Sequence, residues 1–182
     1  MLKDKKILLH VTGSIACYKA CELANLLVKE GAEVQVSLSD GALKFLQPAV
    51  FEGLTHKKAL TQNMFACEPD CIPHITLAQK WADLIVIYPA SANCISRLAC
   101  GLSDDLFGAV FLANNFDKPV LLAPAMNSNM FAHPAVQENL KKLESWGTKI
   151  LPTDEGRLAC GSVGKGKLIS PETAVDFIKE SL

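Results

Sequence analysis

The feature that most constrains the fold is an apolar run without polar alternation, Leu84-Ile-Val-Ile-Tyr88, which stops at Pro89 and a group of small polar residues. A half-buried strand alternates apolar and polar residues, whereas a strand buried on both faces is apolar throughout. Other strand patterns lie over residues 6–11 and 120–123. Strands buried on both faces belong to parallel sheets that helices cover on either side. The chain must therefore supply crossover helices between its strands.

Helical and extended patterns alternate along the whole chain. We predict strands over residues 6–11, 33–38, 83–88, 120–123 and 149–151. We predict helices over residues 14–30, 75–81, 91–102, 105–114, 134–146 and 171–181, with two short helical pieces within 40–54. This order is typical of a three-layer α/β/α fold with a doubly wound, Rossmann-like parallel sheet. Residues 55–73 and the glycine-rich residues 153–167 lack periodicity, and we expect the first of them to form a mobile or partner-covered loop.

Length and composition favour one compact domain over residues 1–182. The chain is 49% hydrophobic and has a net charge of -1, and its basic residues are scattered, which argues against a nucleic-acid partner. Pro, Gly or charged residues interrupt the apolar runs, so we expect no membrane segment. The first residues lack the apolar core and cleavage site of a signal peptide. We therefore expect a cytoplasmic location.

The cysteine count argues against a metal centre. Seven cysteines, an odd number, lack the paired Cys-x-x-Cys spacing of a zinc site, and we expect no bound metal. Most are expected to be small buried apolar residues in a reducing compartment, with Cys160 as the exception.

Four strand ends carry small or hydroxylic residues, which suit a phosphate and a flat heteroaromatic ring. These strand ends are Gly13-Ser14, Ser39, Ser91-Ala-Asn93 and Ala125-Met-Asn127. In an open α/β sheet, ligands bind at the carboxyl ends of the strands. The first strand end is not Gly-x-Gly-x-x-Gly, because Gly13 is followed by Ser14-Ile-Ala-Cys17. A mononucleotide such as FMN therefore fits better than NAD.

Together these motifs resemble those of the homo-oligomeric flavin-containing cysteine decarboxylases. The resemblance is carried by Gly13-Ser-Ile15, His74, Pro89-Ala-Ser-Ala-Asn93, Asp104-Asp105, Pro124-Ala-Met-Asn127 with Met130, and Ala159-Cys-Gly161. Each motif is modest alone, but they occur in the right order from residue 5 to about residue 180.

The resemblance implies a role for each matching residue. FMN would be bound by Gly13, Ser14, Ile15, Ser39, Ser91, Ala92, Asn93, Cys94 and Ala125. Asn127 matches the residue that binds the substrate carboxylate, and His74 matches the active-site acid/base. Ala159, Cys160 and Gly161 match a flexible substrate clamp near residues 153–167, in which Cys160 donates the proton of the final reduction. In this family the active site lies between subunits of a trimer, and trimers can assemble into a dodecamer.

Within the family, the motifs are most similar to those of members that convert 4'-phospho-N-pantothenoylcysteine to 4'-phosphopantetheine in coenzyme A biosynthesis. The implied steps are thiol oxidation, loss of CO2 and re-reduction, and a separate phosphopantothenate-cysteine ligase is an expected partner. One alternative is oxidative decarboxylation of a peptidyl-cysteine in a lantibiotic precursor, which would not need Cys160. Another is a flavin-binding subunit without catalysis, against which His74, Asn127 and Cys160 argue.

Several residues also have simpler interpretations. Cys94 stands where the family commonly has Thr, which removes one hydroxyl donor, and Arg97 stands where Lys is common. Asp104 and Asp105 fit helix caps as well as ligands, and packing is favoured over a substrate role for Met126 and Met130. Solvated loop charges are favoured for Lys165 and Lys167, and surface or structural roles for His10, His56 and His133.

Overall fold

A parallel β-sheet forms the centre of the protein. The computed structural model describes residues 2–62, 72–157, 159, 161 and 163–182. In this part of the chain the sheet has the strand order β3-β2-β1-β4-β5-β6, and every neighbouring pair is parallel. The strands are β1 (Lys6–Val11), β2 (Glu33–Leu38), β3 (Leu60–Thr61), β4 (Leu84–Ala90), β5 (Val120–Pro124) and β6 (Lys149–Ile150).

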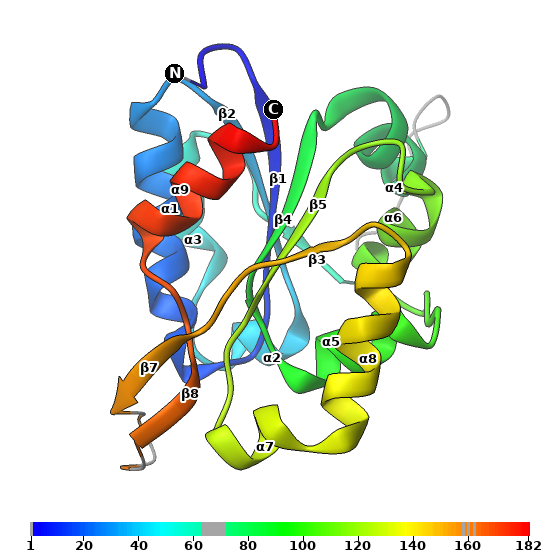
Figure 1. Cartoon of the computed structure of the whole chain (residues 1–182). Coiled ribbons are helices and arrows are strands. Elements are labelled where there is room, and N and C mark those ends of the chain that lie inside the picture. Colours follow the sequence, from blue (N-terminus) through cyan, green and yellow to red (C-terminus); the bar gives the residue numbers. More distant parts are fainter. Residues whose placement is uncertain (1, 63–71, 158, 160, 162) are drawn as a thin grey trace.

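Helices cover both faces of this sheet (Figure 1). One layer contains α1 (Lys19–Lys29), α3 (Pro48–Thr55) and α9 (Pro171–Glu180), and the other contains α5 (Ala92–Ala99), α6 (Leu106–Asn114) and α8 (Pro134–Ser145). Successive side chains of β4 point to opposite faces of the sheet. Val86 packs in the hydrophobic core under α1, α3 and α9, and Ile87 packs in the core under α5, α6 and α8. All seven residues of β4 are buried. The predicted three-layer, doubly wound fold is confirmed.

The chain reverses its direction of winding between β1 and β4. From β1 it runs outward to β2 and β3, then returns to the other side of β1 and continues to β6. The Thr12 hydroxyl joins the ends of the two central strands, because it donates to the Pro89 carbonyl at 2.7 Å and accepts from the Ser91 N–H at 2.8 Å. Ligand crevices of open α/β sheets form at such a switch point.

The remaining helical elements are short. They are the 3-10 helix η1 (Ile15–Tyr18), α2 (Asp40–Leu43), α4 (Pro73–Ile75), the π-helix η2 (Thr76–Trp81) and α7 (Ser128–Ala132). The predicted helix over 14–30 is therefore divided into η1 and α1, and the helix expected over 75–81 is mainly a π-helix. The two pieces expected within 40–54 are found as α2 and α3.

An antiparallel hairpin was missed by the sequence reasoning. Residues 153–167, expected to lack regular structure, contain β7 (Asp154–Arg157) and β8 (Val163–Lys167). Their glycines and exposed charges hide the two-residue alternation of a strand. The hairpin is attached to the end of β5, because the Met126 N–H donates to the Gly166 carbonyl at 3.0 Å. Strand β3 was also missed, since two residues give no pattern, and most of the remaining predicted loop, residues 63–71, lies outside the described residues.

The described cysteines vary in burial. Cys17 and Cys94 are buried, Cys21 is half-buried and Cys100 is exposed, whereas Cys67, Cys71 and Cys160 lie outside the described residues. No helix in the described ranges is both long enough and apolar enough to cross a membrane.

Tyr88 attaches the carboxyl-terminal segment to the central sheet. Its buried hydroxyl donates to the Ile169 carbonyl, which lies between β8 and α9, at 2.7 Å. Burial raises the pKa of Tyr88, so the hydroxyl stays protonated and acts as the donor. The bond satisfies a carbonyl that has little access to water.

Replacing Tyr88 by Phe is expected to lower the free energy of unfolding by about 1–3 kcal/mol, because the buried Ile169 carbonyl loses its donor. Urea unfolding followed by far-UV circular dichroism measures the change. The matched control is Tyr18→Phe, since Tyr18 is 62% exposed and an exposed substitution should shift stability by less than about 0.5 kcal/mol. Equal unfolding midpoints for the two variants would contradict the structural role of the Tyr88 hydroxyl.

Candidate active site

Four of the polar residues predicted at the strand ends cap helices: Ser14, Ser39, Ser91 and Asn127. Ser39 Oγ accepts from the Ala42 N–H at 3.1 Å, and Ser91 Oγ accepts from the Cys94 N–H at 3.3 Å. Ser14 caps η1 in the same way, and Asn127 Oδ1 accepts from the Asn129 N–H at 2.9 Å. Each of these side chains uses its oxygen to accept from a backbone N–H. Each also carries donor hydrogens, on the hydroxyl of Ser or on the NH2 group of Asn127.

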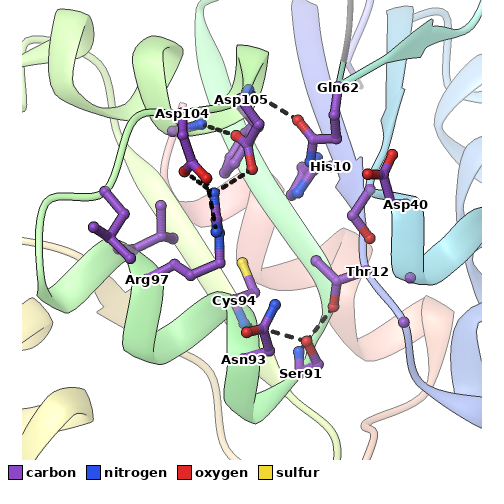
Figure 2. A pocket seen from close by; sticks show the side chains of 17 residues that line it. His10, Thr12, Asp40, Gln62, Ser91, Asn93, Cys94, Arg97, Asp104 and Asp105 are labelled. Carbon is purple, nitrogen blue, oxygen red and sulfur yellow. Dashed lines mark hydrogen bonds and ion pairs between the residues drawn. The ribbon is translucent and has the colours of Figure 1, made fainter.

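A polar cavity of about 290 Å³ lies between the end of β1 and the start of α5. Its lining includes Gly13, Ser39, Ser91 and Asn93. Figure 2 shows Ser91 and Asn93 at the end of the cavity that lies away from Asp104 and Asp105. The first N–H groups of α5 have no acceptor within the helix, and an anion near them gains from the helix dipole. This end of the cavity is therefore suited to a phosphate group.

The other end of the polar cavity holds an ion-pair cluster. Arg97 lies between two carboxylates, paired with Asp104 and, at 2.7 Å, with Asp105 (Figure 2). The hydrogen bond from Arg97 lowers the pKa of Asp104. Asp105 also caps α6, because its Oδ1 accepts from the Gly108 N–H at 2.7 Å. The expected cap is confirmed for Asp105, and both carboxylates line the cavity, which makes this end unsuitable for an anion.

His10 and Cys94 line the same cavity as neutral groups. His10 is buried, and its Nδ1 lies within hydrogen-bonding distance, 3.2 Å, of Ser37 Oγ. Its ring stacks on that of Phe107, with the ring centroids 3.6 Å apart. Burial lowers the pKa of His10 to about 3 and raises the pKa of Cys94 to about 12. Near pH 7 the cavity therefore contains an uncharged imidazole and an uncharged thiol.

An apolar cavity of about 570 Å³ opens beside the polar one and shares Gly13 and Ser91 with it. Its lining includes three large apolar residues that are substantially exposed: Ile15 at 59%, Tyr18 at 62% and Met130 at 49%. Exposed apolar residues gathered round one cavity are typical of a ligand or partner surface.

The two cavities fit the two halves of a flavin mononucleotide. Gly13 is required at their junction, because a Cβ there would stand 2.9 Å from the Gly41 backbone. The phosphate fits the hydroxyls and the α5 N-terminus in the polar cavity, and a flat ring fits the apolar cavity, whose lining includes Ile15 and Ala125. Of the residues predicted to bind FMN, Gly13, Ser39, Ser91, Asn93 and Cys94 line the polar cavity, and Gly13, Ser14, Ile15, Ser91, Ala92 and Ala125 line the apolar cavity.

The predicted substrate and catalytic residues are not all brought together in one chain. Asn127 and Ala159 line the apolar cavity, whereas Cys160 lies outside the described residues, and Gly161 lines neither cavity. His74 also lines neither one. It lies in α4, which packs on α6 at a distance from α7 and the β7–β8 hairpin (Figure 1).

The cavities also contain residues that the sequence reasoning left aside. His10, assigned a surface or structural role, lines the polar cavity together with Gln62. Met126, Met130 and Lys167, for which packing or solvation was favoured, line the apolar cavity. The only signal for His10 was a polar residue near the end of an otherwise apolar strand, at a position that faces the switch point.

Comparisons with known proteins agree with this geometry. The family model described as Flavoprotein matches residues 1–182. The coenzyme A biosynthesis bifunctional protein CoaBC of Bacillus subtilis is 43% identical over 180 residues, which cover 99% of this chain and 44% of that protein. The probable phosphopantothenoylcysteine decarboxylase of Streptococcus mutans is 40% identical over 178 residues, covering 98% of this chain and 99% of that protein. The chain thus spans less than half of the bifunctional relative and nearly all of the other.

Solved structures show the same fold. A cysteine-to-serine variant of PPC decarboxylase complexed with pantothenoylaminoethenethiol has a TM-score of 0.86 and 29% identity, covering 98% of both chains. The FMN-dependent cysteine decarboxylase SpaF has a TM-score of 0.82 and 26% identity, covering 100% of both chains.

The burial of His10 predicts a pH effect on stability. As pH falls below about 6.5, the unfolded chain protonates this histidine but the folded chain, with a pKa of about 3, does not. Between pH 6.5 and 3, the free energy of unfolding should therefore decrease more steeply for the wild type than for His10→Gln. The difference in slope should be up to about 1.4 kcal/mol per pH unit. Urea unfolding at a series of pH values measures both curves. The control is His56→Gln, at an exposed position, whose curve should run parallel to the wild type. A parallel curve for His10→Gln would refute the assignment.

Proposed function

The chain belongs to the flavoprotein family, and we propose that it uses FMN to decarboxylate 4'-phospho-N-pantothenoylcysteine to 4'-phosphopantetheine in coenzyme A biosynthesis. The observation that carries the proposal is the pair of connected cavities, in which a site for a phosphate leads into a site for a flat ring beside Asn127. The similarity to a probable phosphopantothenoylcysteine decarboxylase over nearly the whole of both chains supports the same substrate.

The residue types suit this reaction. Bound FMN supplies the two-electron oxidation of the substrate thiol and the later return of those electrons. Asn127 donates a hydrogen bond to the substrate carboxylate without placing a positive charge there, which would oppose the loss of CO2. Histidine and cysteine, the residue types at positions 74 and 160, commonly move protons in enzymes. Cys160 gives the proton of the final reduction, which favours this activity over oxidative decarboxylation of a peptidyl-cysteine.

We further propose that two copies of the chain build each active site. His74 lies away from both cavities of its own chain, and its buried Nδ1 has no hydrogen-bond partner among the described residues. Buried polar atoms are nearly always satisfied, so a second copy that brings His74 to Asn127 accounts for both observations. It would also cover Ile15, Tyr18 and Met130. The assembly is then a trimer or a larger set of trimers.

The proposal also covers the domain organisation, the functional partner and the location of the protein. Residues 1–182 form one flavoprotein domain in which residues 153–167 act as a clamp over the substrate. A phosphopantothenate-cysteine ligase is the expected functional partner, in line with the bifunctional relatives, and the reaction takes place in the cytoplasm.

Activity is tested by incubating the FMN-loaded protein with phosphopantothenoylcysteine and measuring CO2 and phosphopantetheine. Asn127→Asp is expected to lower kcat/KM for CO2 release at least about a hundredfold, since a carboxylate would repel the substrate carboxylate in a partly desolvated site. Cys160→Ser is expected to release CO2 but form little phosphopantetheine. Wild-type amounts of phosphopantetheine from Cys160→Ser would show that its assigned role is wrong. A protein that does not bind FMN would overturn the whole proposal.

Mixing two inactive variants tests the shared site. His74→Asn and Asn127→Asp, dissociated and reassembled at equal ratio, should recover about a quarter of wild-type activity, because one site in four would combine two intact residues from different copies. Light scattering on the mixture checks the assembly. If each site used residues of one chain, mixing would restore nothing, and a fully active monomer would contradict the proposal directly.

A further inference from the structure

The apolar cavity has a cationic rim, which we define as Lys19 of α1, Arg157 of β7 and Lys167 of β8. Among the described residues that line this cavity, these three carry a charge, and the others are apolar, small or neutral.

The two hairpin members of the rim form no ion pair with the residues that the structure describes. Within the described ranges, the ion pairs closer than 4.0 Å use Lys57, Arg97, Lys118, Lys149, Lys165 and Lys179. Neither Arg157 nor Lys167 is among them. Lys19 differs, because it interacts electrostatically with Glu172. The unpaired positive charge is therefore concentrated on the hairpin.

The Lys167 side chain lies against Gly156 on the neighbouring strand, where a Cβ would stand 3.3 Å from Nζ. A side chain at residue 156 would therefore crowd the ammonium group. By contrast, Lys165 on the same strand is 70% exposed, lies 3.9 Å from Glu155 and lines no cavity. Two lysines of one short strand thus have different surroundings, and only one faces the site.

We propose, on the premise of the function proposed above, that Arg157 and Lys167, assisted by Lys19, bind the 4'-phosphate of the substrate. A phosphate monoester carries a charge of about -1.5 to -2 at pH 7, which matches the two hairpin cations and Lys19 in the lining of the apolar cavity. Arg can bind it through two parallel N–H donors, and Lys acts as a point charge. A peptidyl-cysteine offers no phosphate at this place, so the rim selects the small phosphorylated substrate.

Two ligands of the site carry a phosphate monoester, the substrate and FMN. The polar cavity already provides the FMN phosphate with the α5 N-terminus, Ser39 and Ser91. The rim lies on the other cavity, and two of its members belong to the hairpin that we assign to the substrate clamp. The observations therefore favour the substrate phosphate.

The test compares phosphopantothenoylcysteine with pantothenoylcysteine, which lacks only the phosphate. In the FMN-loaded protein, Arg157→Gln and Lys167→Gln should each reduce the ratio of kcat/KM for the two substrates about ten- to a hundredfold, because each removes a charged hydrogen-bond donor from the phosphate. Lys167→Arg should restore most of the ratio. The matched control is Lys165→Gln, which removes the same charge from the same strand and should leave the ratio unchanged.

A second arm identifies the source of the phosphate. If the rim binds FMN instead, Arg157→Gln and Lys167→Gln will reduce the affinity for FMN relative to riboflavin, and this result overturns the inference. An unchanged substrate ratio in both variants also overturns it.

Calorimetry separates this inference from the function it rests on. Phosphopantetheine should bind the FMN-loaded protein more tightly than pantetheine, and Lys167→Gln should remove most of the difference. If neither cysteine substrate is decarboxylated but this binding difference is present, the proposed function fails and the rim stands. If both are decarboxylated with equal efficiency, the rim assignment fails and the proposed function stands.

Discussion

The hydrogen bonds of the Thr12 hydroxyl determine where the site can form. This one group donates to the Pro89 carbonyl and accepts from the Ser91 N–H, so it fixes the end of β1 against the start of α5 across the switch point of the sheet. Both cavities open beside this connection and share Gly13 and Ser91. A valine at position 12 would leave the Pro89 carbonyl and the Ser91 N–H without these partners in a region with little water. The α5 N-terminus, on which the phosphate site depends, would then lose its alignment.

Much of the fold could be predicted because burial leaves a clear pattern in the sequence. The run in β4 is apolar at every position since helices cover both of its faces, and this pattern alone indicated a parallel sheet. The polar residues at the strand ends were found for a related reason, since each begins a helix and must satisfy its first N–H groups. The division of the helix over 14–30 was not predictable in this way, because a 3-10 turn and an α-helix share nearly the same periodicity.

The parts of the site that the sequence did not reveal lie where side chains are exposed. Arg157 and Lys167 belong to a glycine-rich hairpin, and their charges looked like those of any solvated loop. Only the folded hairpin shows that Lys167 faces the cavity while Lys165 pairs with Glu155 in solvent. His10 was missed for the opposite reason. A single polar residue in a buried strand is most often structural. His10 lies at the cavity because of the order of the strands in the sheet, and the sequence of β1 alone does not reveal that order.

The distribution of charge over the two cavities follows a chemical logic. Under the proposed function the substrate loses CO2 near Asn127, and a fixed cation in contact with the carboxylate would stabilise the starting state against that loss. Among the described residues that line the apolar cavity, the charged groups are the three cations of the rim, and Asn127 offers the carboxylate a neutral amide. In the polar cavity, Arg97 is balanced by Asp104 and Asp105, and His10 is kept neutral by burial. Under the proposed function, phosphate recognition would thus use full charges, while the reacting carboxylate would be bound by the neutral amide of Asn127.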